Sequence, residues 1–383
     1  MSRVALSSLV FAAMVVAQAP AQITFPATPL VSMNFPNPSQ VPYQVYPEPN
    51  FVRGPQTGYN LCNSTTETQD SLCQTSFVDD ITDFCLWAPP KPNSTIADTE
   101  GEEVAWCSKH GHGSRLMPAG TLISAQLLKT PDYIMITGKI DQTKINIQDG
   151  DFGGELDSGG QDERGNPIGG LLYSNGFTGS VIQIQHWTEF IGSSQFCVKI
   201  CNPSGSNPEG YCQHTLDRIG LLYNCPSKYT SGAGGPDGLF EVCDSDDMTV
   251  PGIYTLPDGT TTSYSQPAES LGAITTLPYT PTVPSSSNCV TKASTDLYTD
   301  LATVTPAAGA GSASSSGASS AKPTASSGAS GSNGGSSSGG APSRSGSAGT
   351  PGATGAAENA AATLHVSLFA AVVGTLFAAV FLS

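Results

Sequence analysis

Short runs in which hydrophobic and polar residues alternate dominate the middle of the chain. Residues 123–127, for example, read Ile-Ser-Ala-Gln-Leu. A period of two places successive side chains on opposite faces of a strand, and β-branched and aromatic residues favour strands. We therefore predict strands at residues 123–127, 133–137, 145–147, 182–185 and 196–201.

Glycine-rich segments separate these runs, as at residues 150–154 and 157–160. Such segments are typical of turns between strands. Residues 77–86 and 213–222 are the two segments for which we expect short helices. The pattern as a whole predicts a mainly β fold: one β-rich domain over residues 58–256, sandwich or barrel-like, with long irregular segments and a real hydrophobic core.

Two segments without a strand or helix pattern flank this domain. Residues 22–57 are rich in proline, which excludes a helix, and carry interleaved aromatic residues. We interpret them as an extended arm whose rings pack on the core; a polyproline ligand for a partner is the alternative. Residues 303–359 are almost wholly Ala, Gly, Ser, Pro and Thr, with too little apolar surface to become ordered. We expect a disordered, O-glycosylated stalk.

The N-terminus carries a targeting pattern. Arg3, a short apolar run and small residues before Gln22 predict a signal peptide at residues 1–21. The apolar run is too short to span the hydrocarbon layer, which argues against a membrane anchor at this end.

The C-terminus carries a second targeting pattern. Small residues and a short spacer precede an apolar tail at residues 360–383, which is typical of a glycosylphosphatidylinositol (GPI) signal. We expect the tail to be removed and the lipid to be attached at Asn359, or at Gly355 because the spacer after Asn359 is short. A single-pass tail anchor is the alternative, disfavoured because no Lys or Arg follows Arg344.

The chain contains ten cysteines, all in the expected exported region. They are Cys62, Cys73, Cys85, Cys107, Cys197, Cys201, Cys212, Cys225, Cys243 and Cys289. An even number in a secreted chain predicts a disulfide framework, whose pairing the sequence leaves open. On a strand, Cys197 and Cys201 would lie about 13 Å apart on one face, so each needs a different partner. Cys289 would tie a Ser/Thr/Pro-rich tail at residues 257–302 to the core. The C-x-x-x-C spacing lacks the paired C-x-x-C of structural zinc sites, so we expect no metal.

The charge balance is acidic, with 31 Asp and Glu against 15 Lys and Arg and a formal net charge of −16. This balance argues against a nucleic-acid partner, which requires a basic surface, and suits an extracellular protein. Asn63 and Asn93 each begin an Asn-Ser-Thr sequon, so we predict N-glycosylation at both.

One glycine-rich stretch gathers six acidic residues. They are Asp149, Asp151, Glu155, Asp157, Asp162 and Glu163. Oxygen ligands on a flexible loop could hold Ca²⁺, and a pair of carboxylates could act as acid and nucleophile of a glycosidase. The spacing matches no calcium-loop pattern, and any acidic loop contains such pairs, so we favour a solvated turn.

The histidines and the known catalytic motifs add little. His110 and His112 flank a glycine, a spacing that can grip copper or zinc, but an exposed loop is the favoured interpretation. Nothing in the sequence brings His186 or His214 near them. The predicted β domain has no G-x-S-x-G elbow and no phosphate-binding loop, so we predict no catalytic residues and no cofactor.

Three tryptophans, Trp87, Trp106 and Trp187, are candidates for a sugar-stacking platform. Tryptophans in one domain are more often part of the core, which is the favoured interpretation. The platform nevertheless motivates a second hypothesis, a lectin-like module that binds wall glucan, chitin or mannan.

Several blocks of sequence are long and contain rare residues. They are residues 84–90, 106–107, 113–118, 130–133, 153–157, 165–170, 195–197 and 212–214. Together these blocks resemble the fungal macrophage activating glycoprotein family, which includes immunoreactive mannoproteins of cryptococcal yeasts. The resemblance covers about residues 62–225, the stalk and the anchor signal. It implies a secreted, GPI-linked, mannosylated surface protein recognised by host immune cells, with no established enzymatic activity.

We therefore predict a non-enzymatic, GPI-anchored surface mannoprotein of a fungus that displays glycans and acts as an antigen. Its expected location is the outer face of the plasma membrane and the cell wall, with shedding as a further route. The expected partners are the membrane, through the lipid, and host lectin receptors, through the glycans; wall polysaccharide is a further candidate. A third hypothesis, a wall-remodelling glycosidase, would use two of Glu155, Asp157 and Asp162 across a cleft.

Overall fold

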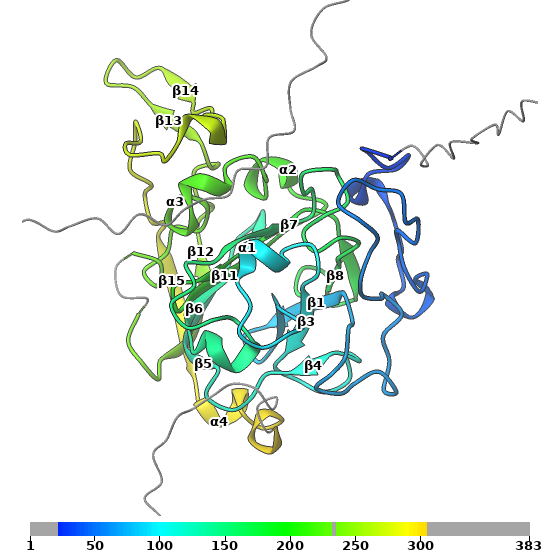
Figure 1. The fold of residues 1–383 in the computed structure, drawn as a ribbon. Coiled ribbons are helices and arrows are strands. Elements are labelled where there is room, and N and C mark those ends of the chain that lie inside the picture. Colours follow the sequence, from blue (N-terminus) through cyan, green and yellow to red (C-terminus); the bar gives the residue numbers. More distant parts are fainter. Residues whose placement is uncertain (1–21, 232–234, 305–383) are drawn as a thin grey trace, which may run out of the picture. The chain divides into compact units, whose positions relative to one another are not determined.

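The computed structural model describes residues 22–231 and 235–304 (Figure 1). Outside these residues lie the predicted signal peptide, the predicted stalk from residue 305 onward, the attachment candidates Gly355 and Asn359 and the predicted C-terminal tail. Among the described residues, no helix has the length and apolar character needed to cross a bilayer.

The larger of two main sheets has seven strands. They are β5 (Leu122–Lys129), β6 (Tyr133–Ile140), β7 (Gly154–Asp157), β10 (Trp187–Gly192), β11 (Gln195–Cys201), β12 (Phe240–Ser245) and β15 (Ser286–Lys292). Their order is β15-β12-β5-β6-β11-β10-β7, and every pair is antiparallel except β12 with β5. β7 and β15 are therefore the edge strands.

The second sheet has six strands. They are β1 (Thr75–Asp80), β2 (Asp83–Ala88), β3 (Val104–Cys107), β4 (Arg115–Leu116), β8 (Leu171–Ser174) and β9 (Ile182–Ile184). Their order is β4-β3-β2-β1-β8-β9, with β1 parallel to β8 and β3 parallel to β4. A separate hairpin pairs β13 (Ile253–Thr255) with β14 (Thr261–Ser263).

One hydrophobic core joins the two main sheets. Phe84 on β2 stacks on Phe196 on β11 at 6.0 Å between ring centroids, and Trp87 lies 5.7 Å from Trp187. All four side chains are buried in one cluster with residues of both sheets. Alternating strand residues fill this layer, as expected for a sandwich. The predicted mainly β fold is confirmed.

The helices are single turns. The α-helical ones are α1 (Ile96–Thr99), α2 (Pro208–Tyr211), α3 (Leu221–Asn224) and α4 (Ser294–Leu297). The 3₁₀ turns are η1 (Leu30–Ser32), η2 (Pro38–Gln40), η3 (Gln142–Ile145), η4 (Asp217–Ile219), η5 (Glu269–Leu271) and η6 (Leu301–Thr303).

Of the two expected helices, the one at residues 77–86 is wrong. These residues form the β1–β2 hairpin, because Val78, Phe84 and Leu86 bury their side chains in the inter-sheet core. Ile81 and Thr82 make the turn between the paired residues Asp80 and Asp83. Residues 213–222 hold only η4 and the start of α3. Gly220, at φ +78° and open to left-handed backbone, separates the two turns.

All ten cysteines are paired. The disulfides are Cys62–Cys73, Cys85–Cys107, Cys197–Cys225, Cys201–Cys212 and Cys243–Cys289. Cys197 and Cys201 have different partners, as the strand geometry predicted, and Cys289 does tie its segment to the core. That segment also supplies β15 and two fully buried leucines, Leu297 and Leu301, so the core extends beyond residue 256.

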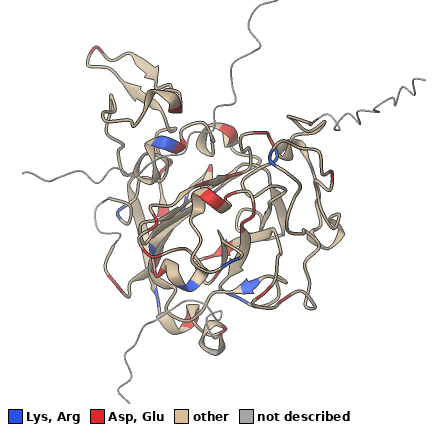
Figure 2. Ribbon diagram, viewed as in Figure 1, with Lys and Arg blue, Asp and Glu red and all other residues tan. Residues whose placement is uncertain are grey.

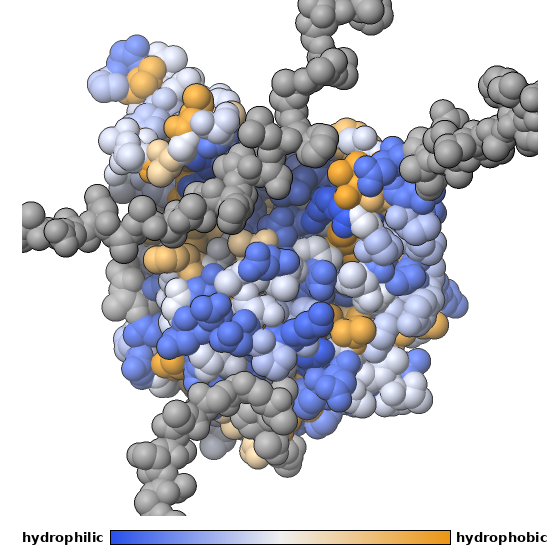
Figure 3. Space-filling view, viewed as in Figure 1, coloured by the Kyte–Doolittle hydropathy of each residue, from blue (hydrophilic) through white to orange (hydrophobic). Residues whose placement is uncertain are grey.

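The proline-rich segment from residue 22 to 57 follows an irregular path with two 3₁₀ turns. Tyr46 and Phe51 are buried in a cluster with Leu171 and Tyr173, as the packed-arm interpretation requires. Acidic positions are spread over the visible elements, and hydrophilic residues cover most of the face in view (Figures 2 and 3).

Candidate functional site

Strand β7 places two acidic side chains on the outer face of the seven-stranded sheet. Leu156 points into the inter-sheet core, so Glu155 and Asp157, one residue to either side, point the opposite way. The strand lies close to β10 because it starts after Gly153: a Cβ there would meet the backbone oxygen of Ile191 at 1.8 Å. Glu155 is 8% exposed and Asp157 is 4% exposed.

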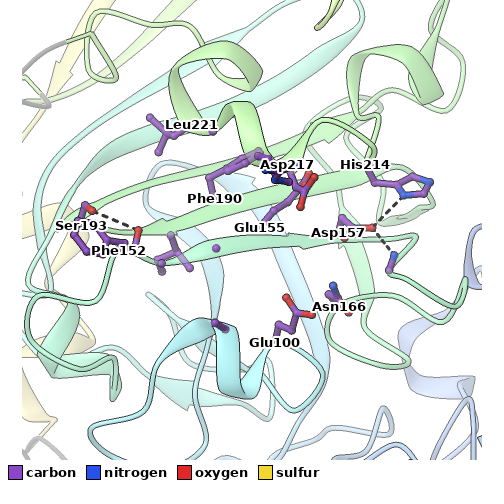
Figure 4. Close-up of a pocket in the computed structure, with 18 of the residues that line it drawn as sticks. Glu100, Phe152, Glu155, Asp157, Asn166, Phe190, Ser193, His214, Asp217 and Leu221 are labelled. Carbon is purple, nitrogen blue, oxygen red and sulfur yellow. Dashed lines mark hydrogen bonds and ion pairs between the residues drawn. The ribbon is translucent and has the colours of Figure 1, made fainter. Parts of the chain in front are cut away.

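Both carboxyl groups line a cavity of about 800 Å³ (Figure 4). β7 and β10 form its floor. Glu100, directly after α1, lies on one side of β7, whereas Asp217 and Leu221 of η4 and α3 lie on the opposite side. Phe152 lies towards one end and His214 towards the other. The cavity is therefore an open cleft that runs along an edge strand.

Two disulfides hold the η4–α3 wall against the sheet. Cys201–Cys212 and Cys197–Cys225 connect β11 to the two ends of the segment that carries this wall. All four cysteines are buried, in one cluster with Phe190 at the floor of the cleft. The covalent links therefore fix the wall at a constant distance from the carboxyl pair.

Glu155 has one satisfied oxygen and one free oxygen. Its Oε1 accepts a hydrogen bond from the Thr188 hydroxyl at 3.1 Å, whereas no residue that the structure describes donates to Oε2. Burial, together with the charges of Asp157 and Asp217, raises the pKa of Glu155 well above its usual range. The more distant Lys199 opposes this shift.

Lys199 lies on β11, two strands away from β7 and level with Asp157, and is fully buried. Its Nζ donates to the backbone oxygen of Asn224 at 2.6 Å. Burial lowers the pKa of Lys199 to about 7, although Glu155 acts in the opposite direction. The lysine is thus held by the α3 wall and forms no ion pair with the carboxyl groups among the described residues.

Asp157 is held more tightly than Glu155. Its Oδ1 accepts hydrogen bonds from the backbone N–H groups of Gly159 and Gly160, both at 2.6 Å, and His214 Nδ1 lies 3.9 Å away. These contacts favour the charged form, but burial still raises the pKa of Asp157. No described residue donates to Oδ2. When one proton is shared between the two carboxyl groups, Glu155 therefore holds it.

Asp162, the third acid of the glycosidase hypothesis, has a structural role. It forms ion pairs with Arg53 at 2.9 Å and Arg164 at 2.8 Å and does not line the cleft. Arg164 also lies over the Phe51 ring, 4.0 Å from its centroid. Asp162 thus joins the proline-rich arm to the core.

The solvated-turn interpretation of the acidic stretch is wrong for three of its members. Glu155, Asp157 and Asp162 are buried, and Asp151 accepts a hydrogen bond from the Ile96 N–H at the start of α1. Only Asp149 and Glu163 are exposed. The sequence pattern does not predict this burial because β7 has only four residues and lies between two glycine-rich turns.

No group of these acids converges as metal ligands among the described residues. The group that does converge comprises Glu241, Cys243 and Cys289, and its two cysteines are bonded to each other. A disulfide offers no thiolate to a metal ion.

The sugar-stacking platform is also wrong. Trp87 and Trp106 are fully buried and Trp187 is 1% exposed, because all three lie on strands facing the inter-sheet core. Arg115 covers the Trp106 ring at 5.0 Å. None of these rings can present a face to a ligand. The exposed aromatic ring at the cleft is instead Phe152, which is 91% exposed.

The two neighbouring histidines have separate partners. His110 contacts Glu67 at 2.8 Å, whereas His112 contacts Asp83 at 2.7 Å and stacks on Phe77. His110 is exposed, as predicted, but His112 is half-buried. His214, which the sequence connected to nothing, lies in the cleft beside Asp157.

Both sequon asparagines are exposed. Asn63 accepts hydrogen bonds from the N–H and hydroxyl of Thr65, and Asn93 occupies left-handed backbone at φ +58°. Glycosylation at Asn63 and Asn93 stays a prediction that this geometry permits.

A disulfide-bonded β-sandwich with an acidic cleft at its edge strand is thus the class of protein that the fold and site define. The chain belongs to a family of fungal appressorium proteins. It is 40% identical over 213 residues to appressorium protein ROW2 of Mycosarcoma maydis, covering 55% of this chain and 71% of ROW2. It is 41% identical over 204 residues to appressorium protein ROW1 of the same fungus, covering 52% of this chain and 46% of ROW1. No family model and no solved structure matches.

Proposed function

We propose that the chain is an exported, GPI-anchored surface glycoprotein of a fungus that displays glycans on a folded core. The observation that carries the proposal is the pairing of all ten cysteines. Disulfides of this density persist in oxidising compartments outside the cytosol. The signal peptide and the GPI signal expected at the two ends support the same location.

The finer parts of the proposal rest on the sequence. Mannose on the stalk and at Asn63 and Asn93 would be the feature that host lectin receptors bind, and the core would supply antigenic peptides. Assignment to the macrophage activating glycoprotein family depends on the sequence blocks. The names of the two relatives support a role in the fungal appressorium.

Phosphatidylinositol-specific phospholipase C tests the anchor. Fungal cells are first treated with glucanase to remove the wall, and the full chain is then followed between membranes and supernatant. We expect the phospholipase to release the protein, and a matched chain ending at Asn359 to be secreted without it. Retention of the full chain, once an acylated anchor is excluded by nitrous acid cleavage, would contradict GPI anchoring.

A second candidate function is saccharide binding in the cleft. The specific observation is that carboxylate and amide side chains converge on one cavity, with Phe152 exposed towards one end. Sugar hydroxyls donate to carboxylates and amides, and the apolar face of a sugar ring packs on an aromatic ring. Several carboxylates in the lining disfavour an anionic glycan, so we propose a neutral one.

Affinity electrophoresis of the full chain in gels containing soluble β-glucan, chitin oligosaccharide or mannan tests this binding. We expect one of the three glycans to retard the protein. Phe152→Ala should reduce the retardation, whereas Phe25→Ala should leave it unchanged, because Phe25 is 54% exposed but lies outside the cleft. Equal behaviour of the two variants would argue against the cleft as the binding site.

A further inference from the structure

The carboxyl pair has features that binding alone does not require. Glu155 and Asp157 are each more than nine-tenths buried, yet Oε2 of the first and Oδ2 of the second accept no hydrogen bond from any described residue. Both side chains line the cleft. Neither oxygen is among the fully buried side-chain atoms that lack a partner, so both are reached from the cleft although the rest of each residue is buried. Two largely buried carboxyl groups that each present one oxygen to the same cavity indicate groups kept free for a ligand or a reaction.

We propose that the cleft hydrolyses a glycosidic bond of a neutral glycan, with Glu155 as the general acid and Asp157 as the general base. This inference rests on the saccharide-binding cleft proposed above. Two carboxyl groups flanking the scissile bond are the usual machinery of glycoside hydrolysis. Neighbouring same-face residues of a strand have Cα atoms about 6.7 Å apart. Hydrolysis with a water molecule between the two groups requires carboxyl groups about 6.5–9.5 Å apart.

The surroundings of the two groups assign their roles. Glu155 accepts only the Thr188 hydroxyl, on Oε1, so Oε2 is left to carry a proton towards the cleft. Asp157 has two backbone N–H donors and faces His214 and Arg53, which stabilise its negative charge. Unequal environments of this kind give two carboxyl groups different pKa values, so that one is protonated and the other is ionised at the same pH.

The reaction is a single displacement in which atoms and charges balance. Asp157 takes a proton from a water molecule, and the water oxygen bonds to the anomeric carbon. The bond between this carbon and the glycosidic oxygen breaks, and its electron pair stays on that oxygen. Glu155 gives its proton to the same oxygen. The products are two shorter glycans, a protonated Asp157 and an ionised Glu155, and proton exchange with solvent restores the starting state.

The full chain, purified from a secreting yeast, tests the activity on the glycan that it binds. New reducing ends are counted over time, and affinity electrophoresis measures binding in parallel. Glu155→Gln and Asp157→Asn should each lower the rate at least 100-fold while leaving retardation in place. Glu163→Gln and Asp149→Asn make the same chemical changes at exposed positions outside the cleft and should leave the rate unchanged.

Two further readouts distinguish catalysis from a structural role. The rate should fall with rising pH as Glu155 loses its proton, and NMR of the first product should show inversion at the anomeric carbon. Retention of configuration would overturn the role of Asp157 as base.

The binding and cleavage measurements together distinguish the possible negative results. Retardation without new reducing ends would overturn hydrolysis and leave the saccharide site standing. If none of the three glycans is bound or cleaved, both the saccharide site and the hydrolysis are rejected. Hydrolysis at the wild-type rate by both Glu155→Gln and Asp157→Asn would also overturn the catalytic roles assigned to these two residues.

Discussion

The disulfide between Cys243 and Cys289 should contribute more to stability than any other in this chain. It closes a separation of 46 residues, the longest of the five. It also joins β12 to the edge strand β15, whose residues are largely exposed. Replacing both cysteines by alanine frees a segment that ends in the buried side chains of Leu297 and Leu301.

The expected loss follows from loop closure. Opening a loop of 46 residues costs about 4 kcal/mol of the free energy of unfolding in the chain-entropy account. The matched control is the double alanine variant of Cys62 and Cys73, whose separation is 11 residues and whose expected loss is about 2.8 kcal/mol. The two variants remove the same atoms and differ mainly in loop length.

Urea unfolding of the full chain measures both losses. The three buried tryptophans report the integrity of the core through their fluorescence, and linear extrapolation gives the free energy in water. We expect the Cys243 and Cys289 variant to lose about 1 kcal/mol more than the control. Equal losses, or a larger loss in the control, would refute the argument from loop length.

Three further outcomes follow from buried groups. Burial raises the pKa of both Glu103 and Glu189 well above the usual value. Their contribution to the free energy of unfolding is therefore full below about pH 4 and is lost as pH rises through the pKa of the folded state. Glu189→Gln should flatten the resulting fall of the thermal unfolding midpoint between acid and neutral pH. Trp187→Ala should cost about 3–5 kcal/mol in urea unfolding without weakening glycan retardation, and a lost retardation at full folding would contradict the core assignment. Asp162→Ala should leave Arg164 buried without its carboxylate partner and speed proteolysis within residues 22–57, which mass spectrometry measures. An unchanged cleavage rate would argue that Asp162 does not hold the proline-rich arm on the core.

The sequence predicts the strands better than the direction in which they face. Alternation is a local property, so residues 123–127, 133–137 and 196–201 lie on strands, as expected. Which face of a strand meets the core depends on the sheet packed against it. For this reason Trp87 and Trp187 are candidates for a platform in the sequence, although both side chains lie in the core between the two sheets.

The cleft could not be predicted for a related reason. Its floor comes from β7, but its walls come from Glu100, about fifty residues earlier, and from Asp217 and His214, about sixty residues later. The pairing of β7 with β10 and the two disulfides on β11 place the later wall, and the hydrogen bond from the Ile96 N–H to Asp151 helps to place α1 beside β7. The even cysteine count indicated such links but not which segments they join.

The buried acids differ in a way that bears on function. Glu189 accepts the backbone N–H of Trp87 at 3.0 Å, and Asp162 binds two arginines, so both have structural partners. Glu103 has an oxygen without a partner, but it does not line the cleft.

Among these acids, only Glu155 and Asp157 are buried, line the cleft and have a carboxyl oxygen that accepts no hydrogen bond from a described residue. Burying ionisable groups side by side costs stability, and apolar residues of similar volume would pack this edge of the sheet at lower cost. Five disulfides give the fold the reserve to carry that cost. The arrangement is therefore better explained by the binding and cleavage that we propose for the cleft than by what it contributes to folding.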